Sequence, residues 1–331
     1  MINRVQSTLK PNNHPYLNGA WTPNFEEYDA DDMKIIGQIP EDIDGIYLRN
    51  TENPVHKPIG RYHPFDGDGM LHMMRFKNGK AEYKNRFIRT KGFEAEAEAG
   101  RALWAGFTMP TASSKRPGCG IGRDLRDGSS TDVLVRNGKI LSTFWQCGDG
   151  YVLDAESLDT LGVEDWVPVD GLSAHPKLDH KTGDLMFFNY SGEAPFMNYG
   201  VVGKDNKLKH YIPVELPGAR LPHDMAITDN YSILNDFPLF PMPAALENGF
   251  LIPQFEAGMK TRFAVVRRFG QPEDIMWFEA EPTYVLHYAN CWEEGDEIVL
   301  EGYHQKSPFP PPLTSMPEEY QILLANLDLH S

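Results

Sequence analysis

The amino-acid sequence predicts an all-β fold, built as a sandwich, a barrel or a propeller. Short apolar runs recur along the 331 residues, and turn-forming residues separate them. Glycine and proline are frequent, with 29 and 26 residues, as expected for many short strands joined by turns. Beyond residue 154 no amphipathic segment of helix length interrupts this pattern until about residue 317. With 41% hydrophobic residues, the chain can bury a large core.

The first third of the chain contains a polar arm and a hairpin. Residues 1–38 are mixed and proline-containing, and we expect an irregular arm there. Residues 45–51 and 70–76 have the composition of strands. The pair Asn78-Gly79 then predicts a tight hairpin from 70–76 into a strand over 81–90.

The next segments continue in the same manner. Residues 93–104 are expected to form a short helix or an ordered loop. A second Asn-Gly pair at 137–138 predicts a hairpin between strands over 132–136 and 139–145. A strand over 151–154 begins another pair, and the last residues, 316–327, are expected to form a short helix.

Charge and cysteine content narrow the function classes. The net charge of −16 disfavours binding to nucleic acid and simple electrostatic docking on anionic lipid. The three cysteines are widely spaced and form no disulfide framework, which favours a reducing compartment. No secretory signal or apolar run of spanning length is visible, so the sequence predicts a cytoplasmic protein. No feature of the sequence indicates a protein partner.

Three histidines stand out because each lies in its own short cassette just before an apolar, strand-like run. We call residues 173–179, 221–228 and 286–294 the first, second and third cassettes, which contain His175, His223 and His287. The histidines are 48 and 64 residues apart, so no single helix or hairpin can bring them together. A histidine at the mouth of each of several strands suggests one metal ion held on the axis of a β structure.

Residue types limit which metal this would be. Neutral imidazole binds Fe(II), Cu or Zn, and no cysteine accompanies the histidines. Asp224 follows His223 directly, but adjacent residues of a strand point to opposite faces, so both are not expected to bind one ion. Each histidine taken singly fits ordinary burial as well as ligation. His63 and His72 are expected to be structural, and the Asp-Gly-Asp-Gly stretch at 66–69 is expected to be a turn rather than a calcium site.

The three cassettes together resemble the carotenoid cleavage oxygenase family, which includes stilbene-cleaving dioxygenases and retinoid isomerases. The resemblance lies in His-Pro-Lys-x-Asp from 175, Pro-His-Asp-Met-Ala-Ile-Thr from 222, and His-x-Ala-Asn-x-Trp-Glu-Glu-Gly-Asp from 287. It extends from about residue 39 to the end, so that one domain over 39–331 is expected. The resemblance implies a seven-bladed β-propeller, with a dome of loops and helix over its axis. Because members are typically longer, it also implies a propeller that is incomplete at the C-terminus and has unpaired edge strands.

The resemblance also implies an Fe(2+) site with His175, His223 and His287 as ligands and no bound carboxylate. The family's fourth histidine has no match, because neither His304 nor His330 lies in the expected surroundings. Where the family often has a glutamate that accepts a hydrogen bond from a ligand histidine, this chain has a glutamine. The remaining candidate site residues are Gln146 as that acceptor, and Phe144, Trp145, Phe237 and Phe240 as walls of a substrate tunnel.

The function that the resemblance implies is a non-haem Fe(II) dioxygenase that cleaves a C=C bond of a carotenoid or apocarotenoid with O2, giving two carbonyl products. One alternative is a stilbene-cleaving dioxygenase, although Trp145 stands where such enzymes are expected to carry a lysine. A second is a catalytically inactive, truncated member or scaffold, and a third is a retinoid isomerase-like hydrolase that consumes no O2. The apolar, proline-broken loop at 237–246 is the candidate for packing, tunnel lining or peripheral membrane contact.

Overall fold

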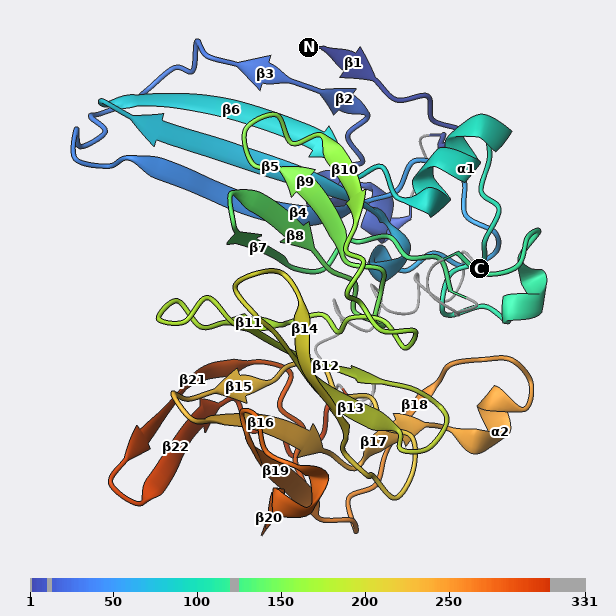
Figure 1. Cartoon of the computed structure of the whole chain (residues 1–331). Helices are drawn as coiled ribbons and strands as arrows, with labels where there is room; N and C mark the ends of the chain where they lie inside the picture. The colour runs from blue at the N-terminus through green and yellow to red at the C-terminus, as the bar shows by residue number, and fades with distance from the viewer. Residues whose placement is uncertain (1, 11–13, 120–124, 310–331) are drawn as a thin grey trace. The chain divides into compact units, whose positions relative to one another are not determined.

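The computed structural model describes residues 2–10, 14–119 and 125–309 (Figure 1). Short antiparallel sheets supply most of the regular structure, which confirms the all-β prediction. Within the described residues the chain forms two compact units, one of residues 2–144 and 149–164, the other of 145–148 and 165–309. The helix expected over 316–327 lies outside the described residues.

The first unit contains two four-stranded antiparallel sheets and one two-stranded sheet. One sheet has the order β3-β6-β5-β4, with β3 Asp29–Ala30, β4 Gly45–Asn53, β5 Asp68–Lys77 and β6 Lys80–Phe87. The other has the order β10-β9-β8-β7, with β7 Val133–Arg136, β8 Lys139–Ser142, β9 Tyr151–Asp154 and β10 Thr160–Val163. In the arm, β1 Asn3–Arg4 pairs with β2 Glu26–Glu27, and β3 joins the first sheet.

Both hairpins predicted from Asn-Gly pairs are confirmed. Asn78 and Gly79 have φ angles of 50° and 69° between β5 and β6, and Asn137 and Gly138 have 52° and 74° between β7 and β8. Two successive positive φ angles define the type I′ turn, whose twist matches that of the flanking strands.

The expected helix is α1, Lys91–Ala99. It begins after Thr90, whose side chain accepts a hydrogen bond from the Phe93 N–H, and it ends at Gly100, which has a φ of 62°. A capping threonine and a left-handed glycine are common boundaries of helices. They explain why the helix starts and stops earlier than the expected range of 93–104.

The second unit contains two more four-stranded sheets. The first has the order β11-β12-β13-β14, with β11 Lys177–Leu178, β12 Leu185–Tyr190, β13 Met197–Val202 and β14 Leu208–Pro213. The next has the order β15-β16-β19-β20, with β15 Ala226–Ile227, β16 Tyr231–Asp236, β19 Thr261–Arg267 and β20 Met276–Ala280.

Two-stranded sheets and short helical turns complete the described regular structure. β17 Leu239–Pro241 pairs with β18 Pro253–Phe255, β21 Tyr288–Glu294 pairs with β22 Glu297–Gly302, and α2 is Pro243–Leu246. The 3-10 turns are η1 Pro15–Leu17, η2 Gly19–Trp21, η3 Pro64–Asp66, η4 Thr111–Ser113 and η5 Pro272–Asp274.

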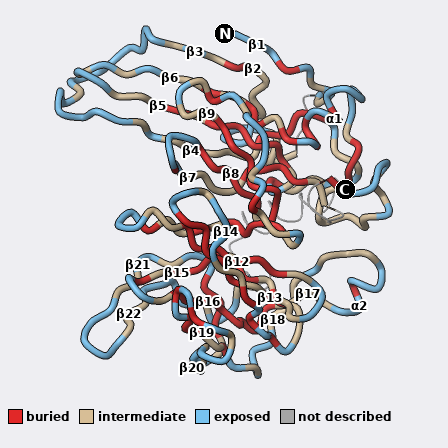
Figure 2. Tube along the Cα trace, in the orientation of Figure 1, coloured by how far each residue is buried: buried red, intermediate tan, exposed pale blue. Residues whose placement is uncertain are grey.

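The core of the second unit is centred on the middle strands of its sheets (Figure 2). All six residues of β12 are buried, as expected for a strand covered on both faces. Its largest apolar cluster includes Met186, Phe188, Tyr199, Leu234 and Val266. This packing holds the outer strands β11 and β15, which follow His175 and His223.

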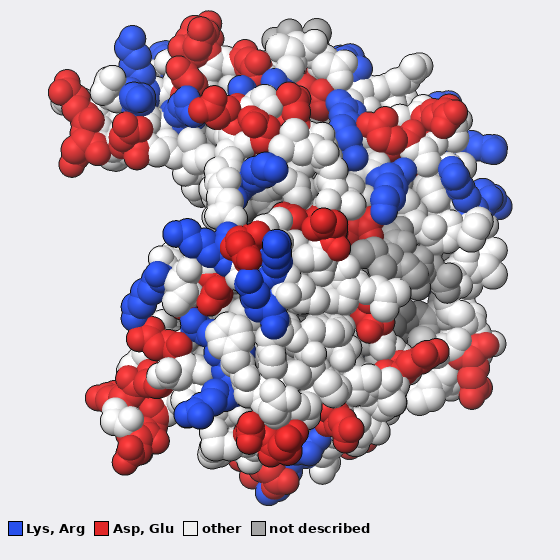
Figure 3. Space-filling view, viewed as in Figure 1, with Lys and Arg blue, Asp and Glu red and all other residues white. Residues whose placement is uncertain are grey.

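The β21–β22 hairpin differs from the four-stranded sheets of this unit. Within the described residues β22 pairs with β21 alone, and Ile298 and Leu300 face an open cavity of about 850 Å³ that is also lined by residues of β16, β19 and β20. Exposed acidic side chains surround its turn, namely Glu293, Glu294, Asp296 and Glu297 (Figure 3). Charged side chains disfavour unwanted pairing at an exposed strand edge.

Candidate metal centre

The three cassette histidines lie just before the first strand of three different sheets of the second unit. His175 lies two residues before β11, His223 three residues before β15, and His287 immediately before β21. Each sheet therefore presents one imidazole at the point where the chain enters it. The pairing of strands into these sheets therefore brings together three histidines that are 48 and 64 positions apart in the sequence.

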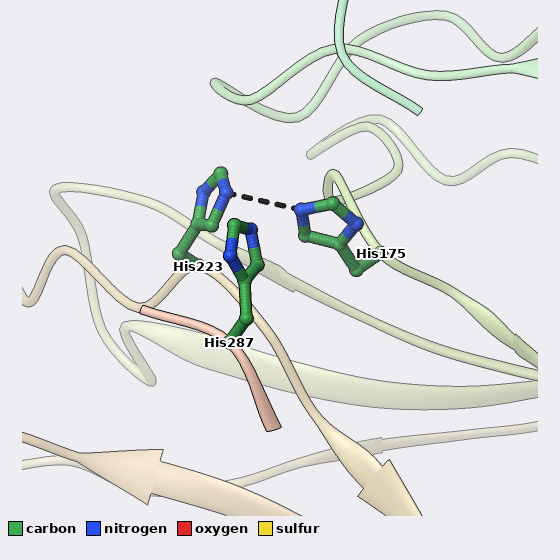
Figure 4. A group of neighbouring side chains, drawn as sticks. All are labelled: His175, His223 and His287. Carbon is green, nitrogen blue, oxygen red and sulfur yellow. Dashed lines mark hydrogen bonds between the residues drawn. The ribbon is translucent and has the colours of Figure 1, made fainter. Parts of the chain in front are cut away.

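The three imidazoles converge (Figure 4). The Nε2 atoms of His175 and His223 are 3.0 Å apart. The ring centroid of His287 lies 4.9 Å from that of His175 and 5.1 Å from that of His223. One nitrogen of each ring lies within 4.8 Å of the others, so a single ion could contact all three. His175 and His223 are half-buried, whereas His287 is exposed.

The chemistry of this group fits a metal ion. Two facing ring nitrogens 3.0 Å apart need either a shared proton or a cation near both lone pairs. Two nitrogens that bind one ion with bonds of about 2.1 Å lie about 3.0 Å apart when the angle between the bonds is 90°, and about 3.4 Å apart when it is tetrahedral. The observed separation is that of a hydrogen bond between the rings, and it is also short enough for both nitrogens to bind one ion. Three imidazoles without a thiolate suit Fe, Cu, Zn or Ni.

Asp224, next to His223, is not part of this group. Its carboxylate is buried, and it accepts hydrogen bonds from the backbone N–H groups of Met225 and Tyr288. Its Oδ1 also lies 2.6 Å from the Lys177 ammonium. As expected for adjacent residues of an extended chain, Asp224 and His223 point to different surroundings.

A second set of polar contacts joins the cassettes away from the imidazoles. The buried Arg268 donates to the Asp179 carboxylate of the first cassette and to the Thr228 carbonyl oxygen of the second. The Thr228 hydroxyl in turn lies 2.5 Å from Glu293 of the third cassette. Although burial opposes ionisation, hydrogen bonds from Arg268, Lys181 and Thr182 lower the pKa of Asp179 to about 2. We call these contacts the Arg268 clamp.

Sequence reasoning missed the Arg268 clamp. Arg268 directly follows β19, and neither its spacing nor its neighbours resemble a motif. The available signal was the polar residue Asp179 of the first cassette, because a buried carboxylate needs a cationic partner. Only the fold identifies which of the many arginines supplies it.

Gln146, the predicted acceptor for a ligand histidine, is buried in the second unit. Its amide nitrogen has no hydrogen-bond partner among the described residues. The role of Gln146 beside a ligand therefore stays a prediction.

The four aromatic residues predicted to form tunnel walls occupy different surroundings. Phe144 and Phe237 are buried, and Phe237 packs with Leu239 and Tyr284 in an apolar cluster. Trp145 is half-buried, and Phe240 is half-buried with the Arg220 guanidinium 5.8 Å from its ring centre. Their role as tunnel walls stays a prediction.

The other histidines named from the sequence lie outside the cluster. His63 accepts a hydrogen bond from the Phe65 N–H at the start of η3, and burial lowers the pKa of His63 to about 4. His72 on β5 lies 2.7 Å from the Tyr83 hydroxyl. His304 is exposed and does not belong to the metal-binding group of the described residues, and His330 lies outside those residues.

The family model of the retinal pigment epithelial membrane protein, RPE65, matches residues 21–322 of this chain. The chain belongs to the carotenoid oxygenase family. The resemblance seen in the three cassettes is therefore confirmed, and the four-stranded sheets are blades of the β-propeller of carotenoid oxygenases. The number of seven blades stays a prediction.

This chain is similar to relatives that are named after different substrates. It is 33% identical over 305 residues to the carotenoid 9,10(9',10')-cleavage dioxygenase of Crocus sativus, covering 86% of this chain and 56% of the relative. It is 33% identical over 308 residues to the isoeugenol monooxygenase of Pseudomonas nitroreducens, covering 91% and 63%. The crystal structure of Pseudomonas brassicacearum lignostilbene dioxygenase superposes with a TM-score of 0.79 at 27% identity, covering 89% of this chain and 62% of that one.

The chain thus spans a little more than half the length of the curated carotenoid oxygenases that it matches. Within the described residues, none of the helices is both long and apolar enough to cross a membrane.

Proposed function

We propose that His175, His223 and His287 hold one Fe(2+) ion, and that the protein uses it to cleave a C=C bond of an apolar conjugated substrate with O2. The observation that carries this proposal is the convergence of three imidazoles from three sheets in a chain of the carotenoid oxygenase family. The names of relatives, which include dioxygenases for carotenoids and for lignostilbene, support oxidative alkene cleavage.

The ligand set and the family favour iron. Three imidazoles without a thiolate suit Fe(II), and the chain belongs to the carotenoid oxygenase family. Because imidazole ligands are uncharged, they leave the charge of a ferrous ion intact. When bound, ferrous iron supplies a site at which O2 is activated toward an alkene without a reducing cosubstrate.

In this reaction the protein itself would hold the ion and shield the substrate from water. Each imidazole lies at or near the start of a hydrogen-bonded strand. The Arg268 clamp stabilises the fold around them by joining residues four to six positions beyond the imidazoles. Apolar side chains around the substrate would exclude water from the reacting double bond. In the overall reaction one C=C bond breaks, and each oxygen atom of O2 ends in one of the two carbonyl products.

For the substrate we propose a carotenoid or apocarotenoid, which Trp145, Phe237 and Phe240 of the second unit would line. A tryptophan at position 145 can stack on a conjugated polyene, whereas it offers no cation to a phenolate. The alternative is a stilbene or a phenylpropene, which is supported by relatives named isoeugenol monooxygenase and lignostilbene dioxygenase.

A second candidate function is that of an inactive family member or scaffold. The observation that favours it is the exposure of His287, because a ligand open to water is less well fixed than His175 and His223. In this case the protein would keep the fold of the family and bind iron weakly.

The test is anaerobic reconstitution with Fe(2+), followed by measurement of iron per chain, O2 uptake and products. An apocarotenal and a hydroxylated stilbene are supplied in parallel under 18O2, with His223→Ala as the control. Near-stoichiometric iron and aldehyde products that contain 18O and depend on His223 are the expected result. Cleavage that continues without O2 would contradict the proposal and favour the hydrolase alternative, and a folded protein that binds no iron would favour the scaffold.

A further inference from the structure

One buried carboxylate contacts all three cassettes close to the imidazoles. Asp224 directly follows His223 in the second cassette, and only 3% of its side chain is exposed. Burial of a carboxylate is costly unless cations and hydrogen-bond donors surround it. The cations and donors that contact Asp224 therefore indicate its role.

The first partner comes from the first cassette. The Lys177 ammonium lies 2.6 Å from Asp224 Oδ1, and Lys177 is only two residues beyond His175. The same oxygen accepts a hydrogen bond of 2.8 Å from the Met225 N–H, which keeps the carboxylate oriented. An ion pair with one partner fully buried is much less screened by water than a surface pair.

The second partner comes from the third cassette. Asp224 Oδ2 accepts a hydrogen bond of 3.0 Å from the backbone N–H of Tyr288, the residue after His287. A closed ring of hydrogen bonds supports this contact. The Tyr288 hydroxyl donates to Asn235 Oδ1, and Asn235 Nδ2 donates over 2.7 Å to the carbonyl oxygen of Asp224.

These contacts share one feature, which is that they involve residues close to the candidate ligands. Each of them lies within two residues of a candidate ligand: Lys177 of His175, Asp224 of His223, and Tyr288 of His287. The Arg268 clamp, in contrast, joins the cassettes at Asp179, Thr228 and Glu293, which are four to six residues beyond the histidines. Any displacement of Asp224 is therefore passed to the imidazoles over a much shorter path.

We propose that Asp224 is a positioning residue that sets the spacing of His175, His223 and His287. The proposal rests on the metal centre proposed above. Asp224 does not bind the ion; it fixes the backbone and side-chain neighbours of the three ligands before the ion arrives. Groups that hydrogen-bond a ligand directly contribute a factor of about 10 to 100 to metal affinity, and Asp224 acts one contact further from the ion, so we expect an effect near the lower end of that range.

The decisive variant is Asp224→Asn, which keeps the shape but replaces one acceptor oxygen with an NH2 donor. That donor must face either Lys177 and the Met225 N–H or the Tyr288 N–H, so one link between cassettes is lost. We expect the affinity for Fe(2+), titrated anaerobically, to fall about 10-fold. With Co(2+) as the probe, the visible absorption of the bound ion should also change in shape, because the angles between ligands change.

A matched control is Thr228→Val, which is nearly isosteric and breaks the link from Thr228 to Glu293 in the Arg268 clamp. It also loosens the second cassette from the third, but at residues five and six positions beyond His223 and His287. We expect a lower Tm with an Fe(2+) affinity within about threefold of the wild type and an unchanged Co(2+) spectrum. Equal losses of affinity in both variants would show that any weakening of the fold lowers affinity, and would overturn the proposal.

Lys177→Met provides an independent second variant in case Asp224→Asn does not fold. It removes only the link to the first cassette, so we expect a smaller loss of affinity than in Asp224→Asn, and an altered Co(2+) spectrum. If the wild type binds Fe(2+) and the folded Asp224 or Lys177 variant binds it equally well, the positioning role is wrong while the metal centre stands. If the wild type itself binds no Fe(2+), the metal centre is wrong and the positioning role falls with it.

Discussion

The two units of the molecule place histidines next to strands in opposite ways. In the first unit, His63 and His72 interact with groups of their own turn or sheet: the Phe65 N–H for the former, the Thr51 and Tyr83 hydroxyls for the latter. In the second unit, three histidines from three sheets face one another. Burial does not separate the two cases, because His72 is half-buried and His287 is exposed. Convergence of imidazoles from distant segments is what distinguishes a candidate ligand from a structural histidine.

The largest expected effect is on Fe(2+) affinity, when one histidine of each unit is substituted in turn. His223→Ala should lower the Fe(2+) affinity by more than about 100-fold, beyond the loss typical of residues that only contact a ligand. His72→Gln, which retains hydrogen-bonding capacity toward Tyr83, should leave affinity unchanged. Iron per chain after anaerobic reconstitution measures both. Equal iron in both variants would remove the distinction between the units.

The next effect concerns how firmly the cassettes of the second unit are joined. Arg268→Met leaves the Asp179 carboxylate buried without its cation, and breaking a buried pair in this way costs about 3–5 kcal/mol. We expect a loss of this size in the free energy of unfolding in urea. A loss below about 1 kcal/mol would mean that the clamp does not hold the cassettes together.

A smaller effect tests the histidine of the first unit. Burial lowers the pKa of His63 to about 4, so the folded state disfavours its protonation. The stabilisation is present above the unfolded pKa of about 6.5 and is lost as the pH falls toward 4. Allowing for its partial exposure, we expect a loss of about 1–2 kcal/mol between pH 7 and pH 4.

The matched variant is His63→Asn, in which the amide oxygen can still accept the Phe65 N–H at the start of η3. Urea unfolding at several pH values should show a shallower decline below pH 6.5 than in the wild type. Identical pH profiles would indicate that His63 titrates alike in the folded and unfolded chain.

The smallest effect is expected at an exposed counterpart of the Arg268 clamp. Lys181 and Asp229 form an ion pair of 2.7 Å between the turns that follow the first and second cassettes, with side chains 73% and 67% exposed. Surface pairs of this type contribute little, so Lys181→Ala should leave urea unfolding unchanged. A clear loss would show that contacts between these turns matter regardless of burial.

The local features of the fold and the identity of the converging histidines could be predicted from the sequence. Turn chemistry at Asn78 and Asn137 is local, so both hairpins were predictable. The three histidines were found because each cassette is a contiguous motif. The partners of Asp224 were not predictable in this way, because Lys177 and the Tyr288 N–H reach it only through the packing of different sheets.

The spacing of the cassettes has a consequence for folding. In an unfolded chain, closing loops of 48 and 64 residues around one ion would cost roughly 3–4 kcal/mol each in chain entropy. The unfolded ensemble would therefore have little affinity for an ion that the folded chain is proposed to bind through all three imidazoles. Almost the whole binding free energy would then appear as resistance to unfolding. Retention of iron would thus report long-range order across three sheets, and its release would be an early sign that this order is being lost.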